Sequence, residues 1–210
     1  MFSVQRFNGF LAGIGQDMAW RPASRCPCRS GISGAPKLGC PICNAKGWFW
    51  TPAVTACRAG LSGMKVQRQW EAFGQFAAGD VVITIGSDTP LYAAGEMDRI
   101  VMSNSTEAFN DVLTGGEVLD FSVSSVSNVF WLDPAGSAVI QGAIPAVQAD
   151  GSLVWATDAT APAAGQQFTM IGRKIPEYFL YRDFAQDRSH QGGAALPRRV
   201  ALRRFALFGK

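Results

Sequence analysis

Four of the five cysteines in this chain lie within eighteen residues, and their thiols are the side chains whose chemistry is clearest. One residue separates Cys26 from Cys28, and two residues separate Cys40 from Cys43. A two-residue gap lets one turn present two sulfur atoms to the same ion, and four thiolates form a tetrahedral metal site, most often for zinc. The spacing therefore predicts a structural Zn²⁺ site with these four cysteines as its ligands.

Other interpretations of the cysteine cluster stay open. Two disulfides would need an oxidising compartment, whereas residues 1–16 carry Arg6 and Asn8 where a secretory signal would have an apolar core. A redox-active pair or iron–sulfur ligation is a further alternative. Catalytic zinc usually keeps one open position beside three protein ligands, so four cysteines favour a structural role. Cys57 stands apart and is expected to be a buried small side chain, or else a reserve ligand.

Basic and aromatic residues surround the cluster. Four basic residues flank it, and they either offset the negative charge of four thiolates on one Zn²⁺ or form a solvated loop: Arg25, Arg29, Lys37 and Lys46. Trp48, Phe49 and Trp50 follow the last cysteine. Because a small metal module has little core of its own, these rings are expected to pack over it or to anchor a neighbouring subunit. Stacking on nucleic-acid bases is the alternative.

Charged residues are unevenly distributed along the 210-residue chain, whose formal charge is +3. Residues 1–72 carry nine Lys/Arg and two Asp/Glu. Residues 73–172 carry one Lys/Arg and eleven Asp/Glu, and residues 173–210 carry nine Lys/Arg and three Asp/Glu. This order is expected if basic parts of one subunit meet the acidic part of its neighbour. The alternatives are a basic surface that faces nucleic acid and ends that fold back on the acidic middle of the same subunit.

Periodicity predicts the elements that position the cluster. Residues 4–18 are predicted to form a helix, because apolar residues recur there at intervals of three and four. Residues 105–113 are predicted to form a helical turn capped by Ser105 or Thr106. Short apolar runs between turn signals predict β-strands from residue 64 onward. These runs are residues 64–73, 80–85, 98–102, 118–123, 129–132, 138–140, 153–156, 167–171 and 177–181.

Many short strands without strand–helix alternation favour a mainly β fold. We predict an antiparallel barrel or sandwich with an N-terminal helix and a small four-cysteine zinc-knuckle module. The expected divisions are residues 1–62 for the helix and the knuckle, 63–182 for the barrel or sandwich, and 183–210 for a C-terminal basic and apolar arm. The last segment combines arginine pairs with large apolar residues, so it either joins the barrel as a strand or docks on a neighbour.

Motifs for catalysis are absent from the sequence. His190 is the single histidine, and there is no Gly-x-Ser-x-Gly, paired-histidine or phosphate-loop motif. Carboxylates such as Asp80, Asp98 and Asp120 are scattered at turns and strand ends, which is typical of a solvated face, although a carboxylate enzyme is a remaining hypothesis. No apolar run is long enough for a membrane-spanning helix.

The order of short motifs along most of the chain resembles that of the head–tail connector (neck) proteins of tailed bacteriophages, of the head-closure or stopper kind. The motifs are Cys40-Pro41-Ile42-Cys43 with Lys46-Gly47-Trp48, residues 79–85, Pro90-Leu91-Tyr92, residues 98–101, 129–132 and 176–179, and Leu196-Pro197-Arg198-Arg199 through Leu207-Phe208.

The resemblance implies a non-enzymatic virion protein, assembled in the host cytoplasm. It implies a ring of copies between portal or adaptor and tail proteins, with DNA passing through the channel and no membrane contact. In that setting a zinc module would rigidify a loop. The residues expected to face a partner or DNA phosphates are Arg198, Arg199, Arg203, Arg204, Trp48 and Trp50. A zinc-dependent nucleic-acid-binding module is the alternative function.

Overall fold

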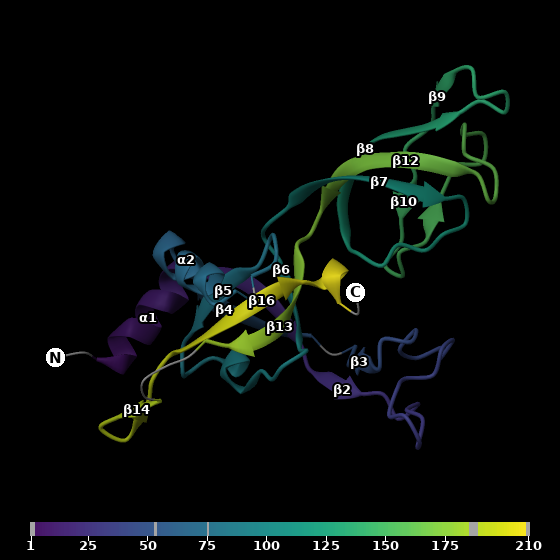
Figure 1. The fold of residues 1–210 in the computed structure, drawn as a ribbon. Coiled ribbons are helices and arrows are strands. Elements are labelled where there is room, and N and C mark those ends of the chain that lie inside the picture. Colours follow the sequence, from purple (N-terminus) through teal and green to yellow (C-terminus); the bar gives the residue numbers. More distant parts are fainter. Residues whose placement is uncertain (1–2, 53, 75, 185–188, 209–210) are drawn as a thin grey trace. The chain divides into compact units, whose positions relative to one another are not determined.

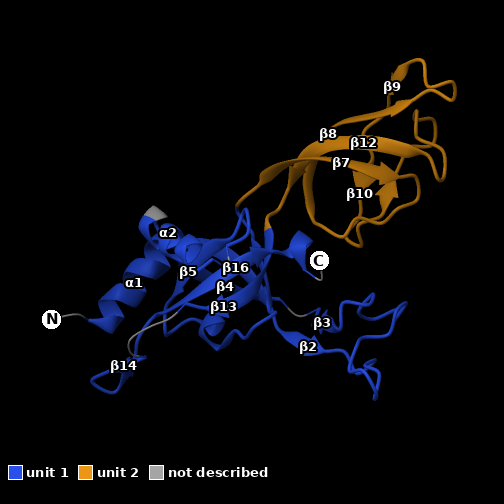
Figure 2. Ribbon diagram, viewed as in Figure 1, with its two compact units in different colours: residues 1–104, 177–210 blue, residues 105–176 orange. Residues whose placement is uncertain are grey.

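The computed structural model describes residues 3–52, 54–74, 76–184 and 189–208 and divides the chain into two compact units. One unit comprises residues 1–104 and 177–210, and the other comprises residues 105–176 (Figures 1 and 2). The mainly β fold with a barrel and an N-terminal helix is confirmed.

The first unit contains a closed barrel of six antiparallel strands. Its strand order is β1 (Gln16–Arg21), β4 (Thr55–Leu61), β5 (Val81–Ile85), β16 (Arg198–Arg204), β13 (Glu177–Asp183) and β6 (Arg99–Met102). Strand β6 pairs with β1 and so closes the barrel. Each strand contributes side chains to one core, which includes Met18, Ala59, Ile83, Ile100, Leu180 and Leu202.

The units do not coincide with the three predicted segments. Barrel strands come from the segment 1–62, from the segment 63–182 and from the segment 183–210. The C-terminal segment is a barrel strand over Arg198–Arg204, where β16 pairs with β5 on one side and β13 on the other. Hydrogen bonding on both edges, together with burial of Val200, makes this stretch part of the core rather than an arm.

Short elements complete the first unit. They are the 3-10 helices η1 (Pro90–Ala93) and η2 (Phe205–Leu207), the hairpin of β14 (His190–Gln191) with β15 (Ala194–Ala195), and the ribbon of β2 (Ala23–Arg25) with β3 (Trp48–Trp50). Within the described residues, neither α-helix has the length and apolar character that crossing a bilayer requires.

Helix α1 (Val4–Ile14) is shorter than the helix predicted over residues 4–18. Gly15 ends it in an extended conformation. A Cβ atom at position 15 would lie 2.5 Å from a carbonyl oxygen of the helix and 3.2 Å from that of Ala59. Glycine therefore lets the chain leave the helix in close contact with β4, and the following residues enter the barrel as β1 with Met18 buried.

The prediction of a strand over residues 64–73 is wrong, because this stretch forms helix α2 (Met64–Ala72). Trp70 is 2% exposed and packs with Val82 of β5. Val66 packs against the same cluster. Residues four apart lie on one face of a helix, so both side chains of α2 reach the same cluster against the barrel.

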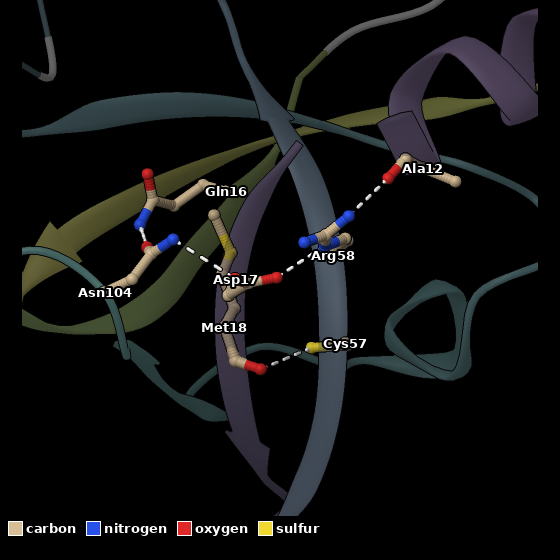
Figure 3. Close-up of polar contacts among 7 residues, drawn as sticks. All are labelled: Ala12, Gln16, Asp17, Met18, Cys57, Arg58 and Asn104. Carbon is tan, nitrogen blue, oxygen red and sulfur yellow. Dashed lines mark hydrogen bonds and ion pairs between the residues drawn. The ribbon is translucent and has the colours of Figure 1, made fainter. Parts of the chain in front are cut away.

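A polar network joins α1, β1 and β4 (Figure 3). Arg58 forms an ion pair with Asp17 and donates a hydrogen bond to the carbonyl oxygen of Ala12 at 2.8 Å. Asn104 donates to Asp17 at 3.1 Å and accepts from Gln16. The hydrogen bond from Arg58 holds the pKa of Asp17 below its usual value.

We expect Asp17→Asn to lower stability slightly at neutral pH and to have no effect in strong acid. The folded-state pKa of Asp17 is depressed. Its contribution to the free energy of unfolding is therefore present above the ordinary pKa of about 4 and is lost as the pH falls through the lowered folded-state value. Both groups are exposed, which keeps the effect small. Urea unfolding at neutral and strongly acidic pH measures it, and a difference that persisted in acid would contradict this assignment.

The second unit contains a four-stranded antiparallel sheet and a small hairpin. The sheet has the order β7 (Glu107–Thr114), β12 (Gln167–Lys174), β8 (Val123–Leu132) and β9 (Val139–Gln141), and the hairpin pairs β10 (Ala146–Val147) with β11 (Leu153–Val154). Alternate side chains on one face of the sheet form a separate core, with Phe109, Leu113, Val129, Trp131, Phe168 and Met170.

Two predictions within this unit are wrong. Where a helical turn was predicted over residues 105–113, strand β7 runs from Glu107 onward and pairs with β12 along its whole length. Residues 118–123 are irregular until β8 begins. Leu119 nevertheless fills the core from this irregular stretch, so its apolar character reflects burial without a strand.

Gly172 lies at a bulge where the register of β12 against β8 shifts. A Cβ atom there would lie 2.2 Å from the carbonyl oxygen of Ser125 and 2.9 Å from the ring of Phe109. We therefore expect Gly172→Ala to lower the free energy of unfolding by about 1–3 kcal/mol, because the backbone must move. Gly95→Ala is the control, since its Cβ would meet no atom within 4 Å. Equal denaturation midpoints for the two variants would contradict the expectation.

Candidate metal centre

The four clustered cysteines lie in a loop that a two-stranded ribbon holds at its base. Strands β2 and β3 pair over three residues, and the Cys26 amide then donates to the Gly47 carbonyl at 2.9 Å. We call residues 26–47 the cysteine finger. Figure 1 shows its irregular chain extending from the ends of β2 and β3. Because the ribbon fixes both ends, the chain between them folds back and brings the two cysteine pairs together.

Tight turns shape the finger around its second cysteine pair. The amide of Asn44 donates to the Cys40 carbonyl at 2.9 Å, and that of Lys46 donates to the Cys43 carbonyl at 2.8 Å. Asn44 and Ala45 both have left-handed backbones, with φ of 45° and 63°. This conformation is uncommon for residues other than glycine, and here it turns the chain back immediately after the second sulfur.

The sulfur atoms have the dimensions of a metal site. All four lie within 4.8 Å of one another. The Sγ atoms of Cys26 and Cys40 are 3.8 Å apart, and those of Cys28 and Cys43 are 3.5 Å apart. A disulfide needs about 2.0 Å, whereas four sulfurs at about 2.3 Å from one central ion lie about 3.8 Å from each other. The geometry therefore fits one tetrahedrally held ion better than two disulfides.

The site is enclosed by its own ligands. Cys26, Cys40 and Cys43 are 1%, 8% and 3% exposed, and Cys28 is half-buried. Four protein ligands fill a tetrahedron and leave no position for a substrate or an activated water. This donor set suits an ion that holds the finger in one conformation.

Backbone amides prepare one sulfur for metal binding. The N–H groups of Cys43 and Ile42 point at the sulfur of Cys40 and lower its pKa to about 6. The N–H of Cys28 also favours the thiolate of Cys26, but burial and the neighbouring sulfurs together raise the pKa of Cys26 to about 12. A metal-free cluster would therefore hold its negative charge mainly on Cys40, and an incoming ion would displace protons from other thiols.

Aromatic packing attaches the finger to the barrel. The Trp50 Nε1 donates to the Met97 carbonyl at 2.9 Å. The Trp50 ring meets Phe205 and Phe208 edge-on, with centroids 5.0 and 5.3 Å apart. Phe49 packs against the cysteines on the other side of the strand. Sequence reasoning did not identify Phe205 and Phe208 as partners of Trp50, because only the fold brings β3 to the C-terminal residues.

The predicted partner-facing arginines lie on β16, and two of them are engaged within the first unit. Arg203 donates to the Asp80 carboxylate at 3.0 and 3.1 Å, and its guanidinium lies 3.7 Å from the centre of the Tyr181 ring. Arg198 forms an ion pair with Asp183 and donates to two backbone carbonyls. These contacts give both side chains a role in holding barrel strands together.

The other predicted contact residues have varied surroundings. Arg199 is exposed, and Arg204 is half-buried with its guanidinium 5.8 Å from the Tyr178 ring. Trp48 is half-buried, and the Arg25 guanidinium lies 5.1 Å from its ring. The six predicted residues therefore differ in surroundings, and Arg199 is the most exposed of the four arginines.

Cys57 lies outside the four-sulfur cluster. It belongs to β4, and its Sγ is 3.5 Å from the Met18 carbonyl oxygen (Figure 3). Burial raises its pKa to about 11. The protonated, partly buried thiol packs beside the barrel core. A substitution at Cys57 therefore provides a control for substitutions of the four clustered cysteines.

Comparison of the chain with protein-family models and with curated protein sequences finds no match. Its function must therefore be inferred from the cysteine finger, the barrel and the surfaces that they present.

Proposed function

We propose that this chain is a non-enzymatic structural protein of a tailed-phage virion. In this role it forms part of the head–tail connector ring through which DNA passes, and Zn²⁺ holds the cysteine finger. The main support is the finger itself, which projects from a small barrel and has four clustered thiols where a core would otherwise be needed. A metal can fix such a loop in one conformation, which suits a protein that must offer the same contact to each neighbour.

The donor set supports zinc as the ion. Four thiolates are typical of structural zinc sites, and soft thiolate ligands favour zinc or iron over Mg²⁺ or Ca²⁺. The sulfur–sulfur distances of 3.5 and 3.8 Å leave room for a single ion, whereas an iron–sulfur cluster places several atoms among its cysteines. Metal analysis of the purified protein separates zinc from iron.

Asp80 and Asp98 are buried, so the interpretation of these two carboxylates as a solvated face is wrong. Their partners support a structural rather than a catalytic role. Asp98 accepts hydrogen bonds from the Trp20 indole at 2.7 Å and from the Ala23 amide at 2.7 Å. Asp80 is held by Arg203 and by other donors. A general acid or base must reach a substrate proton, and these two carboxylates are occupied by partners within the first unit.

Metal content measured together with native mass tests the proposal. We expect about one zinc per chain, as a single tetrahedral site requires. We also expect copies to associate, either alone or with the portal, adaptor and tail proteins of such a virion. A chain that remained a monomer and bound none of those proteins would contradict the connector role.

A zinc-dependent nucleic-acid-binding module is the second candidate. Eight basic and no acidic residues lie between Asp17 and Glu71, and Arg25 lies over Trp48 within this stretch. Aromatic rings beside cationic groups can stack on bases. This function predicts binding to single-stranded DNA that weakens with salt and is lost in Trp48→Ala. Absence of binding at low salt would exclude it.

A further inference from the structure

The tip of the cysteine finger exposes large apolar side chains. Ile32 and Leu38 are 101% and 92% exposed, and Ile42 is 64% exposed. Single exposed apolar residues are common, but a cluster on one short loop marks a contact surface. Because the four cysteines hold the finger, these residues are not needed as its core.

The finger is also basic. It contains Arg29, Lys37 and Lys46 and no acidic residue, and Arg25 lies just before it. Four thiolates on one Zn²⁺ have a net charge of about −2, so the four cations leave the finger with a positive net charge. Arg29 and Lys37 are exposed beside the apolar tip. The finger therefore matches a surface that is both apolar and acidic.

The second unit has an exposed apolar surface on its sheet. Opposite its core, the four-stranded sheet has an outer face with a shallow hollow lined by Val112, Phe130, Leu132, Val139 and Thr169. Val112, Leu132 and Val139 are 65%, 56% and 68% exposed. The residues come from all four strands, so the hollow is a continuous patch across the sheet.

The charge of this unit is opposite to that of the finger. Residues 105–176 carry two basic and seven acidic residues. Lys174 lies 3.9 Å from Asp111 and Arg173 donates to Thr106, so both cations are engaged within the unit. Turns at the end of the sheet carry further acids, Glu117 after β7 and Asp133 after β8.

We propose that the cysteine finger of one copy docks on the outer face of the second unit of another copy. Ile32 and Leu38 would enter the hollow around Val112 and Val139, while Arg29 and Lys37 would approach the acidic turns. Opposite charges steer such an encounter and select its partner. The second copy is the favoured occupant because one chain carries both complementary surfaces.

A finger-to-face contact joins two different surfaces, so an open assembly keeps one unused finger at one end and one unused face at the other. Such head-to-tail contacts form rings when the rotation closes, and filaments when it does not. The inference rests on the proposed ring-forming function and adds the surfaces by which neighbouring copies would meet.

Two charge-introducing variants test the contact by sedimentation velocity across a concentration series. Leu38→Glu places an acid on the finger, and Val139→Lys places a base on the outer face. Both positions are exposed in the chain, so folding and metal content should be retained. Ile14→Glu, at an apolar position of α1 that is 65% exposed, is the matched control. We expect each test variant to associate at least about tenfold more weakly than wild type, as for loss of a central contact residue. The control should associate as strongly as wild type.

Mixing the two test variants gives the sharpest result. Leu38→Glu keeps an intact face and Val139→Lys keeps an intact finger, so at least one productive contact remains. The introduced acid and base are opposite in charge and can restore the second contact, so the mixture should form dimers or larger assemblies where neither variant does so alone. A wild-type chain that stays monomeric, variants that associate like wild type, or a mixture without dimers or larger assemblies would each overturn the inference. If these variants still assembled with portal and tail proteins, the connector role would stand without this contact. If copies associated with each other but did not bind those proteins, the finger-to-face contact would stand and the connector role would be contradicted.

Discussion

Removing the metal is expected to unfold residues 24–50 while the barrel stays folded. The buried side chains of the cysteine finger are those of Cys26, Cys40 and Cys43, with Cys28 and Phe49 packed against them, so little else stabilises the loop. Zinc binding supplies about 10–16 kcal/mol in small zinc modules. With a strong chelator, hydrogen exchange of backbone amides in this stretch should accelerate at least about a hundredfold. Strands β5 and β16 should keep their protection, because their core contains none of the four ligands.

Single cysteine variants separate the metal ligands from the remaining thiol. Cys43→Ser removes one ligand and should reproduce the effect of the chelator, with loss of bound metal. Cys57→Ser is the matched control, because Cys57 lies on β4 outside the cluster, and it should retain about one ion per chain. Unchanged protection of residues 24–50 after complete metal removal would show that the cysteines do not hold the finger through an ion.

Asp80→Ala is expected to lower the free energy of unfolding by about 3 kcal/mol, the effect of breaking a buried ion pair. The Asp80 side chain is fully buried, and the Arg203 side chain is 16% exposed. The carboxylate also accepts from the Trp70 indole at 3.1 Å and from the Ala77 amide at 3.0 Å. Its removal leaves the Arg203 guanidinium, the Trp70 indole and the Ala77 amide without this acceptor. The packing of α2 and β16 beside the start of β5 should therefore weaken together.

The Arg198–Asp183 pair provides the comparison for this variant. The Asp183 side chain is 68% exposed, and exposed pairs contribute about 0–1 kcal/mol. Asp183→Ala should therefore have little effect in urea unfolding. Asp80→Asn should fall between the two alanine variants, since its amide oxygen can still accept from Trp70. Equal stability of Asp80→Ala and Asp183→Ala would contradict the role assigned to the buried pair.

Local patterns in the sequence predicted the parts of the fold that depend on neighbouring residues. The spacing of the four cysteines was enough to predict that they cluster. The apolar run around Ile83, between two glycines, forms β5 as expected. The same local rules misassigned residues 64–73, 105–113 and 118–123, and the cause is clear for the first two. Val66 and Trp70 are four residues apart, which places them on one face of either a helix or a strand, and the surrounding β pattern favoured the strand. Capping residues before β7 outweighed the alternation that places Phe109 in the core.

Contacts between distant residues could not be read from the sequence. The pairing of β16 with β5 joins residues more than a hundred positions apart, as in Val200 opposite Ile83. Arg203 looked available for a partner because the carboxylate that holds it, Asp80, lies in a different part of the chain. Charge and apolar character predicted that the C-terminal residues would be covered, but only the fold identifies what covers them.

The strand order also constrains the sequence of events as the chain leaves the ribosome. The second unit consists of continuous residues 105–176, so it can fold while synthesis continues. The barrel needs Arg198–Arg204 between β5 and β13, and this strand is made after the other five strands of the barrel. Until it arrives, β5 and β13 each have an unpaired edge, and such edges recruit strands from other chains. A nascent or prematurely terminated chain is therefore most prone to aggregation at the barrel, even after its central unit has folded.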